Sequence, residues 1–444
     1  MSNALPKTIF DLPVTTNSTS AVEYIDRFLI AMLSFSKDAD IIYAAVDADP
    51  TCAIANAYAA ALHLFVGSHD ALHEARPYLQ AAVANRKHVT EHERFFINAI
   101  EAWAERNMTM AIAAHEAIAS LFPRDLLSVQ IGQFHYANTG NTAGLLTIAE
   151  QSFPANTHDP FACAMLAFGL EENHHLTDAE MWGRKATELR RVHPWAHHAV
   201  AHVLETQGRL EDGITWMNSV SDTWETCGSS FYTHLWWHLA LFHLDLEDIP
   251  TVLNLYDQHV WGRARQTFAR DQIHSIALLA RLELRGVDVG DRWSVIAPYL
   301  QPRIYEHVVP FWDLHFIYAM AKAGRDDWVA EMLDDLQAYA EAFSPVARTV
   351  WEFVVQPAAR GLVAHARKDW AIAVLELESV RHRFYQLGGS HAQRDLFEQI
   401  YLDALIHARE HLKALTILSS RATSRRNIPA IQREINRIHQ LNDY

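Results

Sequence analysis

Basic side chains are scarce in this 444-residue chain, which has 37 lysines and arginines against 53 aspartates and glutamates. The formal charge of −16, with histidine neutral, argues against a general polyanion-binding protein. Glycine and proline are also few, at 16 and 15 residues. Because all-β and doubly wound α/β folds need many turns of the kind these residues supply, their scarcity favours a helical protein.

Cysteines and long apolar runs are few as well. The three cysteines, Cys52, Cys163 and Cys227, form no CxxC pair. This excludes a zinc knuckle and favours a reducing compartment over a disulfide framework. The longest apolar stretch, residues 53–66, is too short to cross a bilayer of about 30 Å. Residues 1–20 show no basic region followed by an apolar core, so we expect no secretory signal and a cytoplasmic protein.

A repeat of 34 residues dominates the middle of the sequence. Residues 166–186 (LAFGLEENHHLTDAEMWGRKA) align without gaps on residues 200–220 (VAHVLETQGRLEDGITWMNSV), which places Glu171 on Glu205. A period of 34 residues is that of the tetratricopeptide repeat, a pair of amphipathic helices. Gly208 stands where a glycine would end the first helix of the second copy.

Looser copies of the hairpin cover most of the chain, and neighbours in such a stack bury each other's apolar faces. We therefore predict an all-α fold, a tetratricopeptide-like α-solenoid of stacked antiparallel helical hairpins. Residues 1–20 form the one plainly loop-like stretch, and no Gly/Ser-rich linker follows. Residues 21–444 are expected to form a single solenoid, with a centre rich in histidine, glutamate and tryptophan at about residues 164–316.

Histidine is unusually abundant, and protonation of all 27 imidazoles would reverse the formal charge of −16. In the central region His198, His202 and Glu205 stand at i, i+4 and i+7, on one face of one helix. His234 and His238 repeat the i, i+4 spacing in the following hairpin. Because the first helix of each tetratricopeptide hairpin lines the concave surface, these imidazoles and carboxylates are expected to converge there.

Aromatic and further polar residues accompany this cluster. Tryptophans supply the apolar walls expected of a small-molecule pocket, although aromatic residues at helical spacing also serve as ordinary packing. The run PFWDLHF adds an aspartate and a histidine that could reach the same surface. The predicted ligand-binding residues are Trp195, Trp224, His234, Trp237, Asp313 and His315.

Three interpretations of the cluster stay open. In the first, the histidines are part of a hydrogen-bonded core. In the second, they bind a metal. In the third, a glutamate orients a histidine that carries out acid–base chemistry. No HExxH, Ser-His-Asp order, GxSxG elbow, phosphate loop or GxGxxG motif is present, and nothing in the sequence requires a cofactor. The candidate catalytic residues are Glu171, His198, His202, Glu205 and His238, and the candidate ligands of a divalent metal are His198, His202, His234 and His238.

Several runs resemble the tetratricopeptide repeat protein 38 family. They are AFGLEE, WAHHAVAHVLETQGR, HLWWHLALFHLDLED, LYDQHV and FWDLHF, and the likeness extends over nearly the full length. The resemblance implies a cytosolic helical-repeat protein and transfers no established reaction. Thr206 replaces the methionine of the family's HVLEM-type motif.

The sequence thus predicts a cytosolic repeat protein that binds a small molecule or short peptide in a His/Glu/Trp-lined concave pocket. One alternative is an enzyme, a hydrolase or lyase that uses a His/Glu pair or a His-bound metal in the same pocket. A second alternative is a protein-interaction scaffold. Nucleic acid and membrane are not expected as partners, and the sequence does not predict the oligomeric state.

Overall fold

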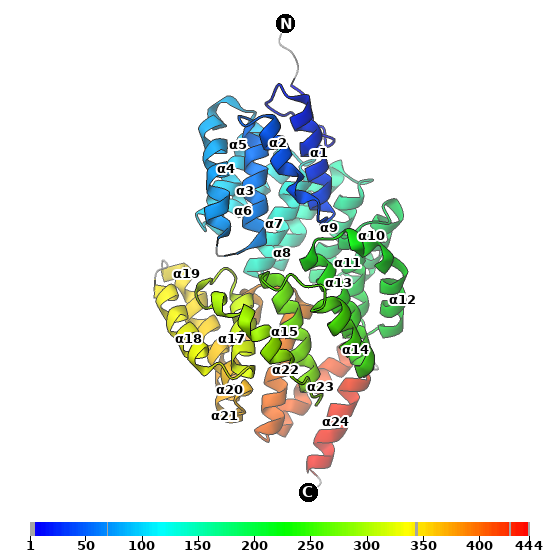
Figure 1. The fold of residues 1–444 in the computed structure, drawn as a ribbon. Coiled ribbons are helices and arrows are strands. Elements are labelled where there is room, and N and C mark those ends of the chain that lie inside the picture. Colours follow the sequence, from blue (N-terminus) through cyan, green and yellow to red (C-terminus); the bar gives the residue numbers. More distant parts are fainter. Residues whose placement is uncertain (1–4, 69, 342–344, 426–427, 443–444) are drawn as a thin grey trace. The chain divides into compact units, whose positions relative to one another are not determined.

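The computed structural model describes the chain apart from residues 1–4, 69, 342–344, 426–427 and 443–444. Across the described residues the backbone is helical, and the only β structure is two isolated bridges, Lys7 with Pro13 and Ser36 with Cys227. The prediction of an all-α, tetratricopeptide-like stack of helical hairpins is confirmed (Figure 1). No helix among the described residues is both long and apolar enough to cross a membrane.

The chain divides into two compact units, and the boundary falls within four helices. The first unit comprises Met1–Ala137, Asn141–Val200 and Val220–Phe231. The second comprises Asn138–Gly140, Ala201–Ser219 and Tyr232–Tyr444.

In the first unit, helices pack as hairpins of neighbours in sequence, as α3 with α4, α5 with α6 and α9 with α10 do. A capping box, in which Thr90 and Glu93 satisfy each other's backbone amides, starts α5. The helices of this part of the chain are α1 (Thr19–Leu33), α2 (Ile42–Ala48), α3 (Ala53–Val66), α4 (Ala71–Asn85), α5 (Glu91–Ala104), α6 (Met108–Leu121), α7 (Leu126–Thr139), α8 (Thr142–Ser152), α9 (Pro160–Glu172), α10 (Leu176–Leu189) and the first half of α11 (Pro194–Thr206).

In the second unit, α20 and α21 form a hairpin, α15 packs on α17 and α22, and α23 packs on α22 and α24. The helices are α12 (Leu210–Val220), α13 (Ser229–Asp245), α14 (Ile249–Leu255), α15 (Ala269–Leu284), α16 (Arg292–Ile296), α17 (Pro310–Lys322), α18 (Asp326–Glu341), α19 (Pro345–Val350), α20 (Gln356–Ala366), α21 (Trp370–Val380), α22 (His391–His407), α23 (His411–Ser424) and α24 (Pro429–Asn442). Short π-helical turns follow α14 and α19.

The helix boundaries reproduce the predicted repeat. Helices α9 and α11 begin at Pro160 and Pro194, and α10 and α12 begin at Leu176 and Leu210, so both pairs are offset by 34 residues. The turn recurs as well, because Gly208 has φ 69° and His174, its counterpart one repeat earlier, has φ 61°. The left-handed conformation is the one a helix end requires, and glycine adopts it without strain.

Burial removes several histidines from the titration expected near neutral pH. Desolvation lowers the pKa of His197 to about 4 and that of His135, His193 and His315 to about 3. Each stays neutral in the folded chain near pH 7, because burial would strip an imidazolium of its hydration. These four imidazoles therefore do not contribute to the charge change near neutral pH that the histidine count predicted.

Close helix packing in the second unit depends on Gly213, where an added Cβ would lie 2.3 Å from a ring carbon of Phe242. Gly213→Ala should destabilise the protein by about 1–3 kcal/mol through overpacking, although alanine is the better helix former by about 1 kcal/mol. The measurement is urea unfolding followed by circular dichroism. Thr215→Ala on the exposed face of the same helix is the control, and an unchanged or raised stability of Gly213→Ala would contradict the packing argument.

Acid should destabilise the fold well above the pH range of carboxylate titration. The folded pKa of His135 lies below that of a free histidine, so the unfolded chain binds the extra proton and stability falls as pH drops from about 6.5 towards 3. Each such group contributes a slope of about 1.4 kcal/mol per pH unit. The free energy of unfolding should be measured at pH 7.5, 6.5 and 5.5. Its slope against pH should fall by the contribution of one histidine in His135→Phe and stay the same in His382→Phe, an exposed position. Equal slopes in both variants would refute the assignment.

Candidate functional site

Four of the predicted site residues lie in the first unit, where two of them belong to aromatic packing. The ring of His198 stacks on Trp195, with centroids 4.8 Å apart, and Trp195 stacks on Phe35 at 5.1 Å. The indole nitrogen of Trp224 donates to Nδ1 of His197 over 3.3 Å. Glu171 is fully buried on α9. Trp195 and His198 therefore pack against each other within this unit.

The second unit brings together five other predicted residues. His202 and Glu205 lie on the second half of α11, and His234, Trp237 and His238 lie on α13. His238 is the centre of the group, because its Nδ1 is 3.3 Å from a carboxylate oxygen of Glu205 and its Nε2 is 3.2 Å from Nε2 of His234. The ring centroid of His202 lies 4.7 Å from that of His238. The two HxxxH helices therefore meet as the spacing predicted, although they meet in the interior.

A tryptophan and a buried arginine close one side of this His/Glu cluster. The rings of Trp237 and His234 stack with an interplanar angle of 11°. The guanidinium of Arg281 lies 5.3 Å from the Trp237 ring and donates to the backbone oxygen of Ala392 over 2.9 Å. Burial lowers the pKa of Arg281 to about 10. Among the described residues, the indole nitrogen of Trp237 has no hydrogen-bond partner.

The remaining two predicted residues have separate partners in the second unit. A carboxylate oxygen of Asp313 lies 3.4 Å from Nδ1 of His307, and His315 donates from Nδ1 to the backbone oxygen of Phe311 over 2.8 Å. His307 also contacts Asp335 at 2.9 Å. Asp313 and His315 are both buried on α17. His315 bonds to the backbone of its own helix, and Asp313 contacts the loop that precedes it.

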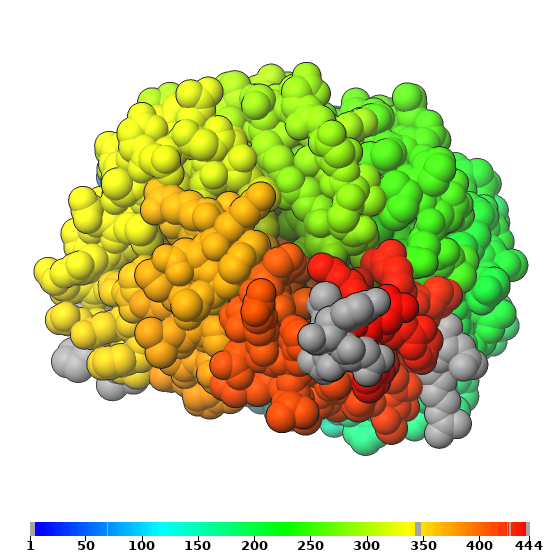
Figure 2. Space-filling model, turned by 90° about the horizontal axis from the view of Figure 1, so that it is seen from below, coloured from blue at the N-terminus to red at the C-terminus, as the bar shows by residue number. Residues whose placement is uncertain are grey.

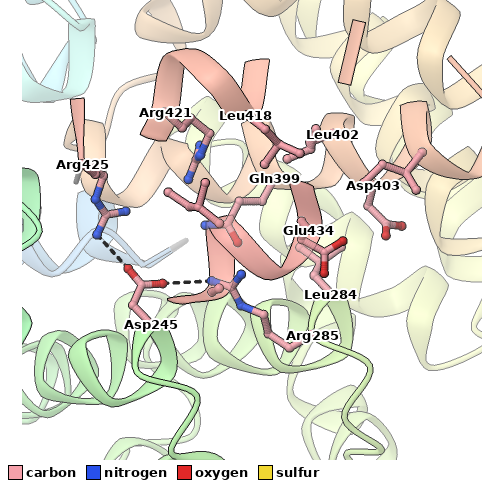
Figure 3. A pocket seen from close by; sticks show the side chains of 13 residues that line it. Asp245, Leu284, Arg285, Gln399, Leu402, Asp403, Leu418, Arg421, Arg425 and Glu434 are labelled. Carbon is pink, nitrogen blue, oxygen red and sulfur yellow. Dashed lines mark hydrogen bonds and ion pairs between the residues drawn. The ribbon is translucent and has the colours of Figure 1, made fainter. Parts of the chain in front are cut away.

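A charged cleft opens on the surface of the second unit, where Figure 2 shows a hollow between green, orange and red segments. The space inside it that a water-sized molecule can occupy is about 40 Å³. Figure 3 shows Arg285, Arg421 and Arg425 around it, with Asp245 bound between two of the guanidinium groups. None of the residues predicted from the sequence lines this cleft.

Each carboxylate that lines the cleft contacts two basic side chains. Asp245 accepts from Arg285 over 2.9 Å and from Arg425 over 2.8 Å, and all three side chains are largely buried. Asp403 contacts His365 at 3.0 Å and His407 at 3.3 Å. Glu434, the third carboxylate, contacts two arginines of its own helix, Arg433 and Arg437, each at 3.3 Å.

Further ion pairs hold the side chains around the cleft in place. Arg421 binds Asp395 through two nitrogen atoms, and the guanidinium holds the pKa of that carboxyl well below its usual range against the opposing effect of burial. Hydrogen bonding to Asp403 raises the pKa of His407. Three arginines and three carboxylates line the cleft.

Arg425 connects the cleft to the His/Glu cluster. Its Nε donates to the backbone oxygen of Glu205 over 3.2 Å while its Nη2 binds Asp245. Burial raises the pKa of Glu205, and the positive charge of Arg425 opposes that shift. Glu205 thus separates an open, arginine-lined cleft from a closed, histidine-lined interior.

Sequence reasoning missed the cleft because its residues come from distant segments. Asp245 ends α13, Arg285 follows α15, and Arg425 follows α23. No local motif links an aspartate to an arginine 180 residues later. The one signal in the sequence was that each of these residues stands at a helix end. Stacked hairpins bring such helix ends together on one face.

No protein-family model matches the chain. Among solved structures, yeast Tom70 is similar over 95% of this chain and 88% of its own, with 13% identity and a TM-score of 0.35. The TPR domain of P58(IPK) is similar over 80% of this chain and 99% of its own, with 11% identity and a TM-score of 0.23. Likeness at this level carries no argument about activity or partners.

Replacing Asp245, whose carboxylate binds two arginines, should lower the free energy of unfolding. In Asp245→Ala, Arg285 and Arg425 lose their common partner while largely buried, and the protein should lose about 3–5 kcal/mol of unfolding free energy. Chemical denaturation measures the change. Asp222→Ala, which breaks the exposed pair with Arg191, is the control and should lose far less. Equal losses in the two variants would show that burial does not govern these pairs.

Proposed function

We propose that this protein is a helical-repeat binding protein whose second unit binds the carboxylate group of a small molecule or short peptide. The observation that carries the proposal is that each lining carboxylate of the cleft contacts two basic side chains. The three arginines that line the cleft carry N–H donors beyond those that bind its carboxylates, the Nε of Arg285 among them, and these donors can bind an incoming anion.

Arginine is the side chain suited to this task. Its planar fork donates two parallel hydrogen bonds to a carboxylate, and its charge persists at all physiological pH values. Arg285 and Arg425 are already oriented by Asp245, so an anion would bind with little loss of side-chain entropy. Their partial burial also strengthens the attraction relative to bulk water.

The His/Glu cluster favours a second candidate function, acid–base catalysis. The hydrogen bond between His238 and Glu205 holds an imidazole beside a carboxylate, an arrangement used by general bases. Glu205 lies directly behind Arg425, so a substrate held by the arginines would have its reactive end near this pair. A hydrolase or lyase would use the cleft for binding and His238 for proton transfer.

We also propose that the chain belongs to the tetratricopeptide repeat protein 38 family and works in the cytoplasm. The support is the set of runs that contain both HxxxH pairs, WAHHAVAHVLETQGR and HLWWHLALFHLDLED. A protein-interaction scaffold is the alternative that a helical-repeat fold allows, and it predicts that the cleft arginines can be replaced without loss of partner binding.

Thermal shift and calorimetric titration of the full chain test the binding function. The probes are succinate, citrate, inorganic phosphate, and one tripeptide with a free or an amidated C-terminus. A carboxylate at 100 times its dissociation constant should stabilise the protein by about 2.7 kcal/mol. Binding should be lost in Arg285→Met and in Arg425→Met.

The matched control is Arg360→Met, which removes an exposed arginine paired with Glu376 in the same unit and outside the cleft. It should bind as the unmodified chain does. If the tripeptide with a free C-terminus binds and succinate does not, the ligand is a peptide. If succinate binds and the tripeptide does not, the ligand is a small molecule. Failure of every carboxylate, or equal binding by all three arginine variants, would refute the proposal.

A further inference from the structure

We propose that His202, His234 and His238 form a zinc site in the interior of the second unit. Each residue offers one ring nitrogen, and these atoms lie within 4.8 Å of one another. The side chains come from two helices, α11 and α13, and the residues are 0%, 8% and 0% exposed. The site is separate from the arginine cleft, because none of the three histidines lines that cleft.

The distances match the geometry of a metal centre. Nε2 of His234 and Nε2 of His238 are 3.2 Å apart. Two nitrogens that each lie about 2.0–2.1 Å from a tetrahedral zinc ion are separated by roughly 3.3 Å. The observed pair therefore has the separation of two ligands before any movement. The nitrogen of His202, within 4.8 Å, reaches the same centre by a shift of about 1.5 Å or less.

Glu205 supplies the outer contact that metal-binding histidines require. Its carboxylate oxygen lies 3.3 Å from Nδ1 of His238, on the opposite side of the ring from Nε2. A carboxylate that accepts from Nδ1–H fixes the tautomer whose Nε2 lone pair points outward, and it makes that nitrogen more basic. Three neutral imidazoles do not offset the charge of a divalent ion. The carboxylate of Glu205 places negative charge beside it.

The ligand set selects the class of metal. Imidazole nitrogens without a thiolate suit zinc. Trp237 stacks on His234, and His274 lies with its ring centroid 4.6 Å from that of His234. These rings restrict movement of His234, so the chelating pair is held in place.

The test measures metal bound to tag-free full-length protein. After dialysis against zinc chloride and then against metal-free buffer, elemental analysis should find one zinc per chain. Cobalt(II) in place of zinc should give the intense visible absorption of tetrahedral coordination. X-ray absorption at the zinc edge should then show three imidazole ligands. These three measurements need no variant.

Variants then assign the ligands. His202→Gln and His238→Gln should each lose the stoichiometric zinc, and Glu205→Gln should weaken binding about 10- to 100-fold. His243→Gln, on the same helix α13, is the matched control, because its Nδ1 contacts Asp248 at 3.1 Å, and it should keep one zinc per chain. Arg425→Met, which impairs carboxylate binding in the proposed function, should also keep the zinc.

A chain that retains less than one tenth of an equivalent after dialysis, or a cobalt complex with the pale octahedral spectrum, overturns the proposal. So does stoichiometric zinc that persists in both His202→Gln and His238→Gln. Because carboxylate titration uses different residues and probes, failure of zinc binding leaves the arginine cleft standing. Failure of the cleft likewise leaves the zinc result standing.

Discussion

The pairing of buried charges is the constraint on which the second unit depends. Its helices enclose several guanidinium groups, among them those of Arg281, Arg285, Arg421 and Arg425, and an unpaired charge in such an interior costs several kcal/mol. Asp245 and Asp395 satisfy three of them, and backbone oxygens satisfy Arg281. These contacts join α13, α15, α22 and α23 and so position both the cleft and the histidines behind it.

The same constraint explains why the polar interior is a candidate for function. Buried ion pairs rarely add stability beyond that of a well-packed apolar core, since desolvation offsets the attraction. Helical hairpins can stack through apolar faces alone, as most of this chain does. Stability therefore does not explain a cluster of arginines, carboxylates and histidines inside such a stack. Ligand binding does explain it.

The sequence predicted most of the fold because the repeat acts locally. The 34-residue offset gives the starts of α9 to α12, and Gly208 marks the turn. The i, i+4 pairs also predicted that His202 and His238 would meet near Glu205. Helical spacing decides which side chains share a face, and repeat stacking decides which faces adjoin.

The cleft lay beyond this reasoning, because Asp245 and Arg425 are brought together by helix ends far apart in sequence. The stacking of His198 on Trp195 also lay beyond it, since spacing alone does not distinguish a stacked aromatic core from a pocket wall. Local periodicity thus specifies helices and their faces, while contacts between distant helix ends specify the charged site.

The most direct test of the account replaces the charged trio by apolar residues of similar size, in the triple variant Asp245→Leu, Arg285→Met and Arg425→Met. The measurement is the midpoint of thermal unfolding of this variant, with carboxylate binding followed in the same sample. If the trio is retained for binding, the midpoint should stay the same or rise while binding is lost. A variant that unfolds at a much lower temperature would show that the charges hold the fold together, and it would contradict the central claim.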